Sequence, residues 1–188
     1  MNDDRPLGGQ ALGEYATFVR FLARVQLDPR LSSKLDAEDI AQKTLLQAHI
    51  ARDECRGENA QQVKAWLRQI LLNVLANALR DLRTAKRDAT RERSLDQALE
   101  DSSQRLDAIL AGDQSTPSQL AQRNEEALQL EEALADLPDR QREAVVLKHY
   151  HGWSLAQISE HMKLSSSAVA GLLVRGMKAL RKVLPEPG

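Results

Sequence analysis

The sequence predicts an all-α fold, with two small helical domains joined by an acidic, partly helical linker. Apolar residues recur at helical spacing along most of the chain, and there is no alternating strand pattern of useful length. Of the 188 residues, 42% are hydrophobic but only 3% are aromatic, so the cores must be built from Leu, Ile, Val and Ala. Capping signatures divide the chain into a domain at 1–93, a linker at 94–116 and a domain at 117–188.

The N-terminal domain is predicted to be a helical bundle with helices at Ala11–Val25, Ala37–Arg52 and Ala60–Arg87. Acidic residues crowd the first turn of the second helix, where the helix dipole favours negative charge, and this accounts for them without any function. Asp39 and Gln42 nevertheless lie one turn apart on the same side of that helix. The same residues could therefore cap the helix or form a docking surface for a basic partner.

The third predicted helix follows a loop at Cys55–Ala60, in which Asn59 and Gln62 form a capping signature. The helix carries a core face of Trp, Leu, Ile and Val side chains and several polar positions. The polar positions are Lys64, Arg68, Asn73, Asn77, Arg80 and Arg83.

Charge is distributed unevenly, although the whole chain has a formal net charge of only −1. Residues 1–93 hold 16 Lys and Arg against 13 Asp and Glu, residues 94–136 hold 2 against 10, and residues 139–184 hold 8 against 3. Two basic blocks flank an acidic one, which indicates two DNA-facing modules and a connector.

Two capping signatures fall around the connector. Ser94 with Gln97 predicts that the connector is partly helical, and Thr116, followed by Pro117 and Gln119, predicts a new helix that starts near Pro117.

The C-terminal domain is predicted to end in a helix-turn-helix unit. Ser154 and Gln157 form a capping box for a short helix at Leu155–Met162, and Ser165 repeats the capping signal before a longer helix. When the longer helix is advanced by about 100° per residue, its apolar residues share one arc and its basic residues share the other. Such segregation suits a helix that docks in a DNA groove, although an ordinary bundle helix with a solvated basic face would look similar. The apolar arc holds Val169, Leu172, Leu173, Gly176, Leu180 and Val183, and the opposite arc holds Ser167, Gly171, Val174, Arg175, Lys178, Arg181 and Lys182.

Other classes of function find little support in the sequence. Cys55 is the only cysteine and the four histidines lack cysteine partners, so we expect no disulfide, no metal and no cofactor. No nucleophile, base and orienting group occur together, so we do not expect the protein to be an enzyme. There is no apolar window of about 18 residues, and Asp3 and Asp4 stand where a secretion signal would be basic, so we expect a cytoplasmic protein with no membrane contact.

Four segments, in this order, carry a resemblance to a known family. These are Asp36–Leu46, Arg56–Glu58, Ala65–Ile70 with Asn73, and Leu137–Glu143 ahead of the helix-turn-helix. Together they resemble the bacterial extracytoplasmic-function (ECF) sigma factors, which are small two-domain initiation subunits of RNA polymerase. The likeness runs from about Glu14 to Val183, apart from the connector.

The resemblance implies a role for each surface. The second helix would bind the clamp of the largest subunit of core RNA polymerase, which favours docking over capping there. The loop and third helix would bind the melted minus-ten promoter element, with a pocket for a flipped-out base in the loop and Asn73 and Asn77 beside it. The polymerase-binding residues would be Asp36, Asp39, Gln42, Lys43, Leu45 and Leu46, and the minus-ten residues would be Glu58, Asn59, Ala60, Lys64, Arg68, Asn73, Asn77 and Arg80.

By the same resemblance, the C-terminal domain would contact the polymerase flap region and recognise the minus-thirty-five element as duplex. Its DNA-binding residues would be Ser165, Ser166, Ser167, Ala170, Gly171, Arg175, Lys178, Arg181 and Lys182. Many relatives carry Lys, Ser or Arg where Ala170, Gly171 and Leu172 stand here, so we expect phosphate contacts and groove shape to contribute more than base hydrogen bonds. Gly171 would let the backbone approach a phosphate or would relieve helix packing.

The acidic connector would thread the polymerase toward its RNA exit channel, and an anti-sigma partner is possible. A stand-alone helix-turn-helix regulator with a helical partner-binding domain is the main alternative, and it predicts tight duplex binding without polymerase. A helical adaptor that binds no DNA is a third, and it would tolerate charge reversal of Lys178, Arg181 and Lys182.

Overall fold

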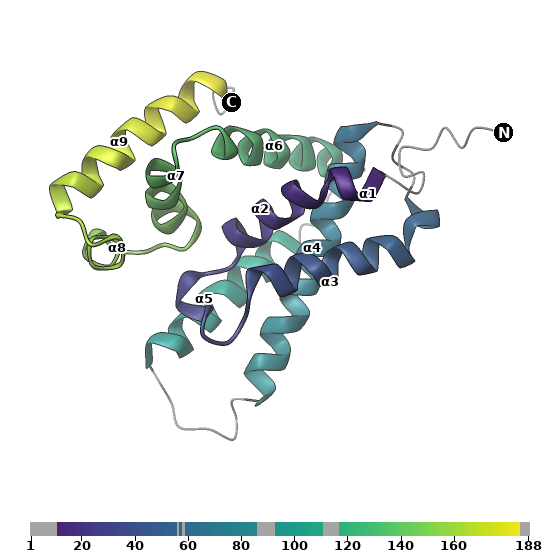
Figure 1. Ribbon diagram of the computed structural model, residues 1–188, viewed down its shortest axis with the longest axis horizontal. Coiled ribbons are helices and arrows are strands. Elements are labelled where there is room, and N and C mark those ends of the chain that lie inside the picture. The colour runs from purple at the N-terminus through teal and green to yellow at the C-terminus, as the bar shows by residue number, and fades with distance from the viewer. Residues whose placement is uncertain (1–10, 56, 58, 86–92, 111–116, 185–188) are drawn as a thin grey trace. The chain divides into compact units, whose positions relative to one another are not determined.

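The computed structural model describes residues 11–55, 57, 59–85, 93–110 and 117–184, and every regular element in these ranges is helical (Figure 1). The all-α class is therefore confirmed. The chain divides into two compact units, Met1–Glu125 and Glu126–Gly188, which we call unit 1 and unit 2. Within the described ranges, no helix has the length and apolar character that crossing a bilayer requires.

Unit 1 contains the predicted helices with small differences at their ends. The helices are α1 (Ala11–Glu14), α2 (Ala16–Gln26), α3 (Ala37–Ile50), α4 (Ala60–Ala85) and α5 (Arg93–Leu110), with short 3₁₀ turns η1 (Pro29–Leu31) and η2 (Arg52–Glu54). The first predicted helix is interrupted at Tyr15, and the second ends at Ile50 rather than Arg52. The predicted end of the third helix at Arg87 lies outside the described residues.

Local capping explains where α3 and α4 begin. The Asp36 carboxylate accepts a hydrogen bond from the Glu38 amide at 2.7 Å, and the Asn59 side-chain oxygen accepts one from the Gln62 amide at 2.9 Å. Each bond satisfies a backbone N–H that has no partner inside its helix. The predicted capping role of Asn59 is therefore confirmed, and Asp36 also caps its helix.

The core of unit 1 is aliphatic, as the composition predicts. Helix α3 packs against both α2 and α4, and α5 packs against α4 and η1 (Figure 1). The largest side chains that are completely buried there are Leu22, Leu31, Ile40, Leu67, Leu71, Leu72, Leu75, Leu79 and Leu106.

Helix α5 belongs to the core of unit 1 rather than to a connector. The sequence prediction treated residues 94–116 as an acidic connector, but Leu95, Ala98, Leu99 and Leu106 of α5 belong to the buried core of unit 1. Leu95, Leu99 and Leu106 recur at helical spacing on one face, so burial of that face outweighs the acidity of the other. The helix begins at Arg93, which places the predicted cap Ser94 inside it. Residues 93–110 are therefore part of unit 1 and do not form a free connector.

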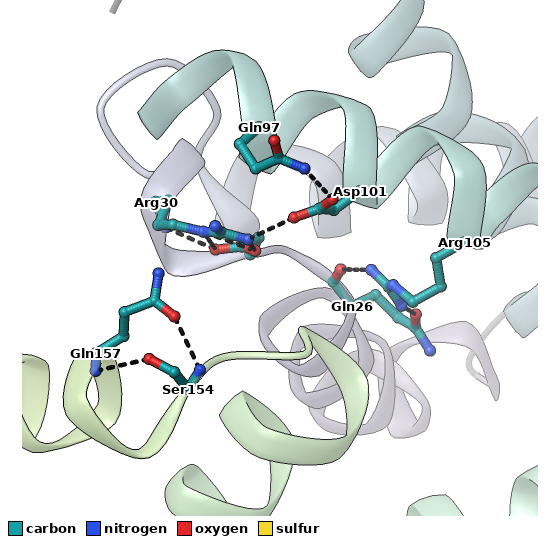
Figure 2. A network of polar contacts seen from close by, with 8 residues as sticks. Gln26, Arg30, Gln97, Asp101, Arg105, Ser154 and Gln157 are labelled. Carbon is teal, nitrogen blue, oxygen red and sulfur yellow. Dashed lines mark hydrogen bonds and ion pairs between the residues drawn. The ribbon is translucent and has the colours of Figure 1, made fainter. Parts of the chain in front are cut away.

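Polar contacts also hold α5 to the end of α2 and to η1 (Figure 2). The Arg105 guanidinium donates to the Gln26 main-chain oxygen at 2.7 Å and to its side-chain oxygen at 2.8 Å. The Arg30 guanidinium lies 2.7 Å from the buried Asp28 carboxylate and 3.3 Å from Asp101 of α5. Burial alone would lower the pKa of Arg30, but the hydrogen bonds and charges of Asp28 and Asp101 outweigh it and raise that pKa.

Unit 2 is built from the second part of α6 (Pro117–Ala135), then α7 (Asp139–Val145), a π-helical turn η5 (Val146–Tyr150), α8 (Leu155–Met162) and α9 (Ser166–Val183). Helix α6 starts at Pro117, as predicted, whereas its predicted cap Thr116 lies outside the described residues. Helices α7 and α9 pack closely at Gly176, where an added Cβ would come within 2.7 Å of the Val145 side chain. Glycine is therefore required at this crossing.

Candidate DNA and polymerase interfaces

The predicted helix-turn-helix unit is present as α8 and α9. The Ser154 hydroxyl accepts from the Gln157 amide at 3.2 Å, and the Gln157 side chain accepts from the Ser154 amide at 2.8 Å, which completes the predicted capping box (Figure 2). Lys163 ends α8 in the left-handed conformation with φ of 54°. The Ser165 hydroxyl then accepts from the Ala168 amide at 3.2 Å and starts α9, as predicted.

A small apolar cluster fixes α8 against α9. Its buried members are Leu147, Trp153, Ile158 and Val169. Because α8 has only eight residues and is too short to be stable alone, this cluster is what holds it in place.

The side of α9 opposite the cluster is exposed and cationic. We call this surface the α9 face: it comprises Ser165, Ser166, Ser167, Ala170, Gly171, Val174, Arg175, Lys178, Arg181 and Lys182. The serines and all four cations are exposed, whereas Ala170 and Gly171 are half-buried. Val174, which the sequence analysis placed on this arc without a role, is 68% exposed. Val183 was predicted to be buried, but it is also 68% exposed because it is the last residue of α9, beyond the last buried position at Leu180.

Gly57 lies close to the first turn of α4. An added Cβ at Gly57 would lie 3.1 Å from both the amide nitrogen and a methyl group of Val63, so a side chain there would crowd the first turn of α4. Asn59 and Ala60 are exposed at the start of that turn. Glu58, a predicted minus-ten residue, lies outside the described residues.

Three of the predicted minus-ten residues lie far along α4 from Asn59. Asn73, Asn77 and Arg80 are exposed, and the Arg80 guanidinium donates to the Asn77 side-chain oxygen at 2.8 Å. At 1.5 Å of rise per residue, Asn73 and Asn77 lie about 20–26 Å along α4 from its start. The prediction that these two residues lie beside the loop is therefore wrong.

Two predicted minus-ten residues are engaged within unit 1. Arg68 is only 9% exposed, so its side chain is not presented on the surface that a DNA contact would need; its long aliphatic stem lets it pack in the helical core. Lys64 is half-buried, and its ammonium lies 5.4 Å from the centre of the Phe18 ring. That distance is within the range of a cation–π interaction.

The outer side of α3 combines polar and apolar groups. We call it the α3 surface: it comprises Asp36, Asp39, Gln42, Lys43, Leu45, Leu46 and Ile50. All are exposed except Leu45, which is half-buried and packs against the core. Leu46 and Ile50 are 59% and 73% exposed. Ile50 was not among the predicted polymerase-binding residues. It follows Asp39, Gln42 and Leu46 at steps of three and four residues, so all four lie on one stripe of the helix.

A capped helix-turn-helix with a cationic outer face, joined in one chain to a separate helical unit, is typical of DNA-binding transcription proteins. Comparison with known proteins is more specific. Residues 13–85 match the family Sigma-70 region 2, and residues 127–180 match Sigma-70, region 4. The chain belongs to the ECF RNA polymerase sigma factors.

Two relatives of known family, CarQ and SigL, agree with this assignment. The chain is 34% identical to RNA polymerase sigma factor CarQ of Myxococcus xanthus, over 90% of this chain and 87% of the relative. It is 31% identical to ECF RNA polymerase sigma factor SigL of Mycobacterium tuberculosis, over 81% of this chain and 76% of the relative. A solved flagellar sigma/anti-sigma complex, Sigma-28/FlgM, covers 94% of both chains with a TM-score of 0.38 and 15% identity.

Membership of this family settles the general activity. The protein is a sigma factor, which binds core RNA polymerase and promoter DNA and directs initiation at specific promoters. Sigma factors are not enzymes, so all bond-forming chemistry belongs to the polymerase.

Proposed function

We propose that the two units divide promoter recognition between them. Unit 1 binds polymerase through the α3 surface and holds the melted minus-ten element, and unit 2 places the α9 face in the duplex minus-thirty-five element. The contrast between the two surfaces is the observation that best supports this division. The α9 face has four exposed cations and no acidic residue, whereas the α3 surface mixes two acids, one amide and one lysine with apolar side chains.

For the α3 surface we propose the clamp of the largest polymerase subunit as the partner. Leu46 and Ile50 form an exposed apolar pair one turn apart, which is unusual for a surface helix without a partner. Asp39, Gln42 and Lys43 border the pair with polar groups, as a rim borders the core of a protein interface. The polar groups would set the register and the apolar pair would supply most of the binding energy.

For the minus-ten element we propose that a flipped base binds at the loop containing Asn59. Unstacking one base costs a few kcal/mol, which a pocket that binds the extruded base can offset. Asn59 and Ala60 support this role because both are exposed at the start of α4, where an extruded base can reach them. Asn73, Asn77 and Arg80, which lie further along α4, would contact the strand at other nucleotides. We leave Arg68 out because it is buried.

For the minus-thirty-five element we propose that the cations of α9 bind phosphates, and that Ser166, Ser167 and Arg175 approach the base edges. The N-terminal part of a recognition helix is the part that lies deepest in the major groove, and the Ser165 cap places the serines there. Unit 2 would also contact the polymerase flap region, and the protein would act in the cytoplasm, where an anti-sigma factor could control it.

The test is transcription by a bacterial core polymerase from a library of randomised promoters, with the wild-type chain, with Asn59→Ala and with Arg175→Ala. We expect transcripts that depend on the chain and share two spaced elements. Asn59→Ala should reduce initiation from duplex promoters more than from pre-melted ones, and Arg175→Ala should weaken selection at the upstream element only. Tight duplex binding by the chain alone, with no effect on transcription by the core enzyme, would contradict the proposal.

A further inference from the structure

Gly171 and Arg175 are coupled on the α9 face. A Cβ added to Gly171 would lie 3.3 and 3.7 Å from the two terminal nitrogens of Arg175 and 3.8 Å from its Cζ. The guanidinium therefore occupies the space above Gly171 that a side chain at this position would need. Long side chains on a helix point back toward its N-terminus, so the residue four positions earlier decides whether the head group can lie flat there. Neither of the two roles that the sequence analysis gave Gly171 describes this contact.

The positions near Gly171 on the α9 face carry short side chains. Ala170 precedes Gly171, and Ser167 lies one turn before it, so neither projects far from the helix. Val174 lies next to Arg175 in the sequence and is 68% exposed. An exposed valine beside a planar cation gives this part of the helix a recognition chemistry that the phosphate-binding cations further along do not have.

We propose that Gly171 and Val174 determine which base pairs α9 recognises. Gly171 is a positioning residue that keeps the Arg175 guanidinium flat on the helix, where its parallel N–H groups can donate to N7 and O6 of a guanine. Val174 contacts the C5-methyl group of a thymine at a neighbouring pair. Both are standard pairings in the major groove, where guanine presents two acceptors and thymine presents a methyl group. This inference rests on the proposed role of α9 at the minus-thirty-five element.

The experiment uses the holoenzyme formed from the full chain and a bacterial core polymerase, on promoters with the upstream element randomised. The variants are Gly171→Leu, Gly171→Ala, Arg175→Ala, the double variant Gly171→Leu with Arg175→Ala, and Val174→Thr, which keeps the shape of valine but replaces one methyl group with a hydroxyl. Leucine is chosen because it fills the space above residue 171 and favours the helix more than glycine does. A thermal unfolding curve for each variant checks that the fold is retained.

Arg175→Ala is expected to reduce the preference for guanine at one position by about tenfold or more, which is the usual discrimination of a bidentate contact. Gly171→Leu should cause a similar loss at the same position, Gly171→Ala should cause a smaller one, and the double variant should be no worse than Arg175→Ala alone. That non-additivity would show that Gly171 acts through Arg175. Val174→Thr should relax the thymine preference at a different position.

Three results would overturn the inference. The first is an unchanged base preference in Gly171→Leu. The second is a double variant that loses much more promoter binding than Arg175→Ala does. The third is that Arg175→Ala weakens binding to all upstream sequences alike. The second would mean that leucine simply collides with DNA, and the third that Arg175 is a phosphate anchor. If the wild-type holoenzyme selected no upstream element at all, the proposed function itself would fail, and this outcome is distinguishable from the other three.

Discussion

At the level of single residues, Asn59 has two separable tasks. Its side-chain oxygen caps α4, and its amide nitrogen is proposed to meet the flipped base. Asp caps a helix as well as Asn does, so Asn59→Asp should leave stability unchanged but remove the donor and reduce open-complex formation by about tenfold. Asn59→Ala should lose both and lower the free energy of unfolding by about 1 kcal/mol. Thermal unfolding and permanganate footprinting of the promoter measure the two effects separately.

A charge control belongs to this prediction. Gln62→Glu adds the same negative charge at an exposed position in the first turn while keeping the Asn59 amide. If Gln62→Glu reduced promoter opening as much as Asn59→Asp, charge repulsion from DNA would explain the loss. Normal opening with Asn59→Asp would exclude the amide as a base contact.

The residue scale also separates what sequence can and cannot predict. The caps at Asn59, Ser154 and Ser165 are local features, because each side chain bonds to the amide three residues later, and all three were predicted. Burial of Arg68 and exposure of Val183 depend instead on which distant helices pack nearby. Helical spacing predicts which arc of a helix is apolar, but not how wide or how long the part covered by other helices is. Arg68 was therefore expected at the surface and Val183 in the core.

At the level of elements, α5 should stabilise unit 1 as a core helix. Leu106 is completely buried among unit 1 leucines, so Leu106→Ala should lower the free energy of unfolding by about 2–5 kcal/mol, through lost burial and the cavity left behind. Ile109 lies on the same helix but is 36% exposed, so Ile109→Ala should cost less than about 1.5 kcal/mol. Urea denaturation compares the two. Equal and negligible effects would mean that α5 is a free connector after all.

The polar attachments of α5 should differ greatly in strength. Arg105→Ala would remove the donor that bonds both oxygens of Gln26, a residue that is only 1% exposed. The free energy of unfolding should fall by about 1–3 kcal/mol. Arg83 and Glu100 also link α4 to α5, at 2.9 Å, but both side chains are about half exposed. Arg83→Ala should therefore change stability by less than about 1 kcal/mol, and added salt should reduce its effect. Urea titrations at low and high salt measure both, and a larger effect for Arg83→Ala would contradict this ranking.

The sequence contained enough information to predict α5 as a helix but not its partner. Its acidic residues suggested a connector, and the charge count was given more weight than the apolar stripe of Leu95, Leu99 and Leu106. Whether such a stripe is covered depends on the shape that α4 and η1 present to it, which charge and spacing do not contain. The match to Sigma-70 region 2 ends at residue 85, so α5 also lies outside both matched segments.

At the level of the whole molecule, the net charge of −1 is the sum of two basic segments and one acidic segment. A chain that is nearly neutral overall should bind duplex DNA weakly by itself, because the acidic segment repels phosphates while the α9 face attracts them. Specific recognition then requires that polymerase hold both units on the promoter, which raises the effective concentration of each unit at its element. If polymerase binds the α3 surface as proposed, promoter recognition by both units depends on that contact.

The last prediction tests that dependence. In the double variant Leu46→Asp with Ile50→Asp, the two exposed apolar side chains of α3 become carboxylates. Neither residue is buried, so unit 1 should keep its stability, whereas affinity for core polymerase should fall by about tenfold or more because the apolar centre of the interface is lost. Fluorescence anisotropy of the labelled chain titrated with core enzyme measures the affinity.

Thr17→Asp, at an exposed position on α2, is the control and should bind normally. Because the α9 face is unchanged, the double variant should still bind duplex DNA at low salt, more weakly only by the repulsion that its two added carboxylates contribute. If core binding survived both substitutions, the polymerase interface would lie on another face of unit 1.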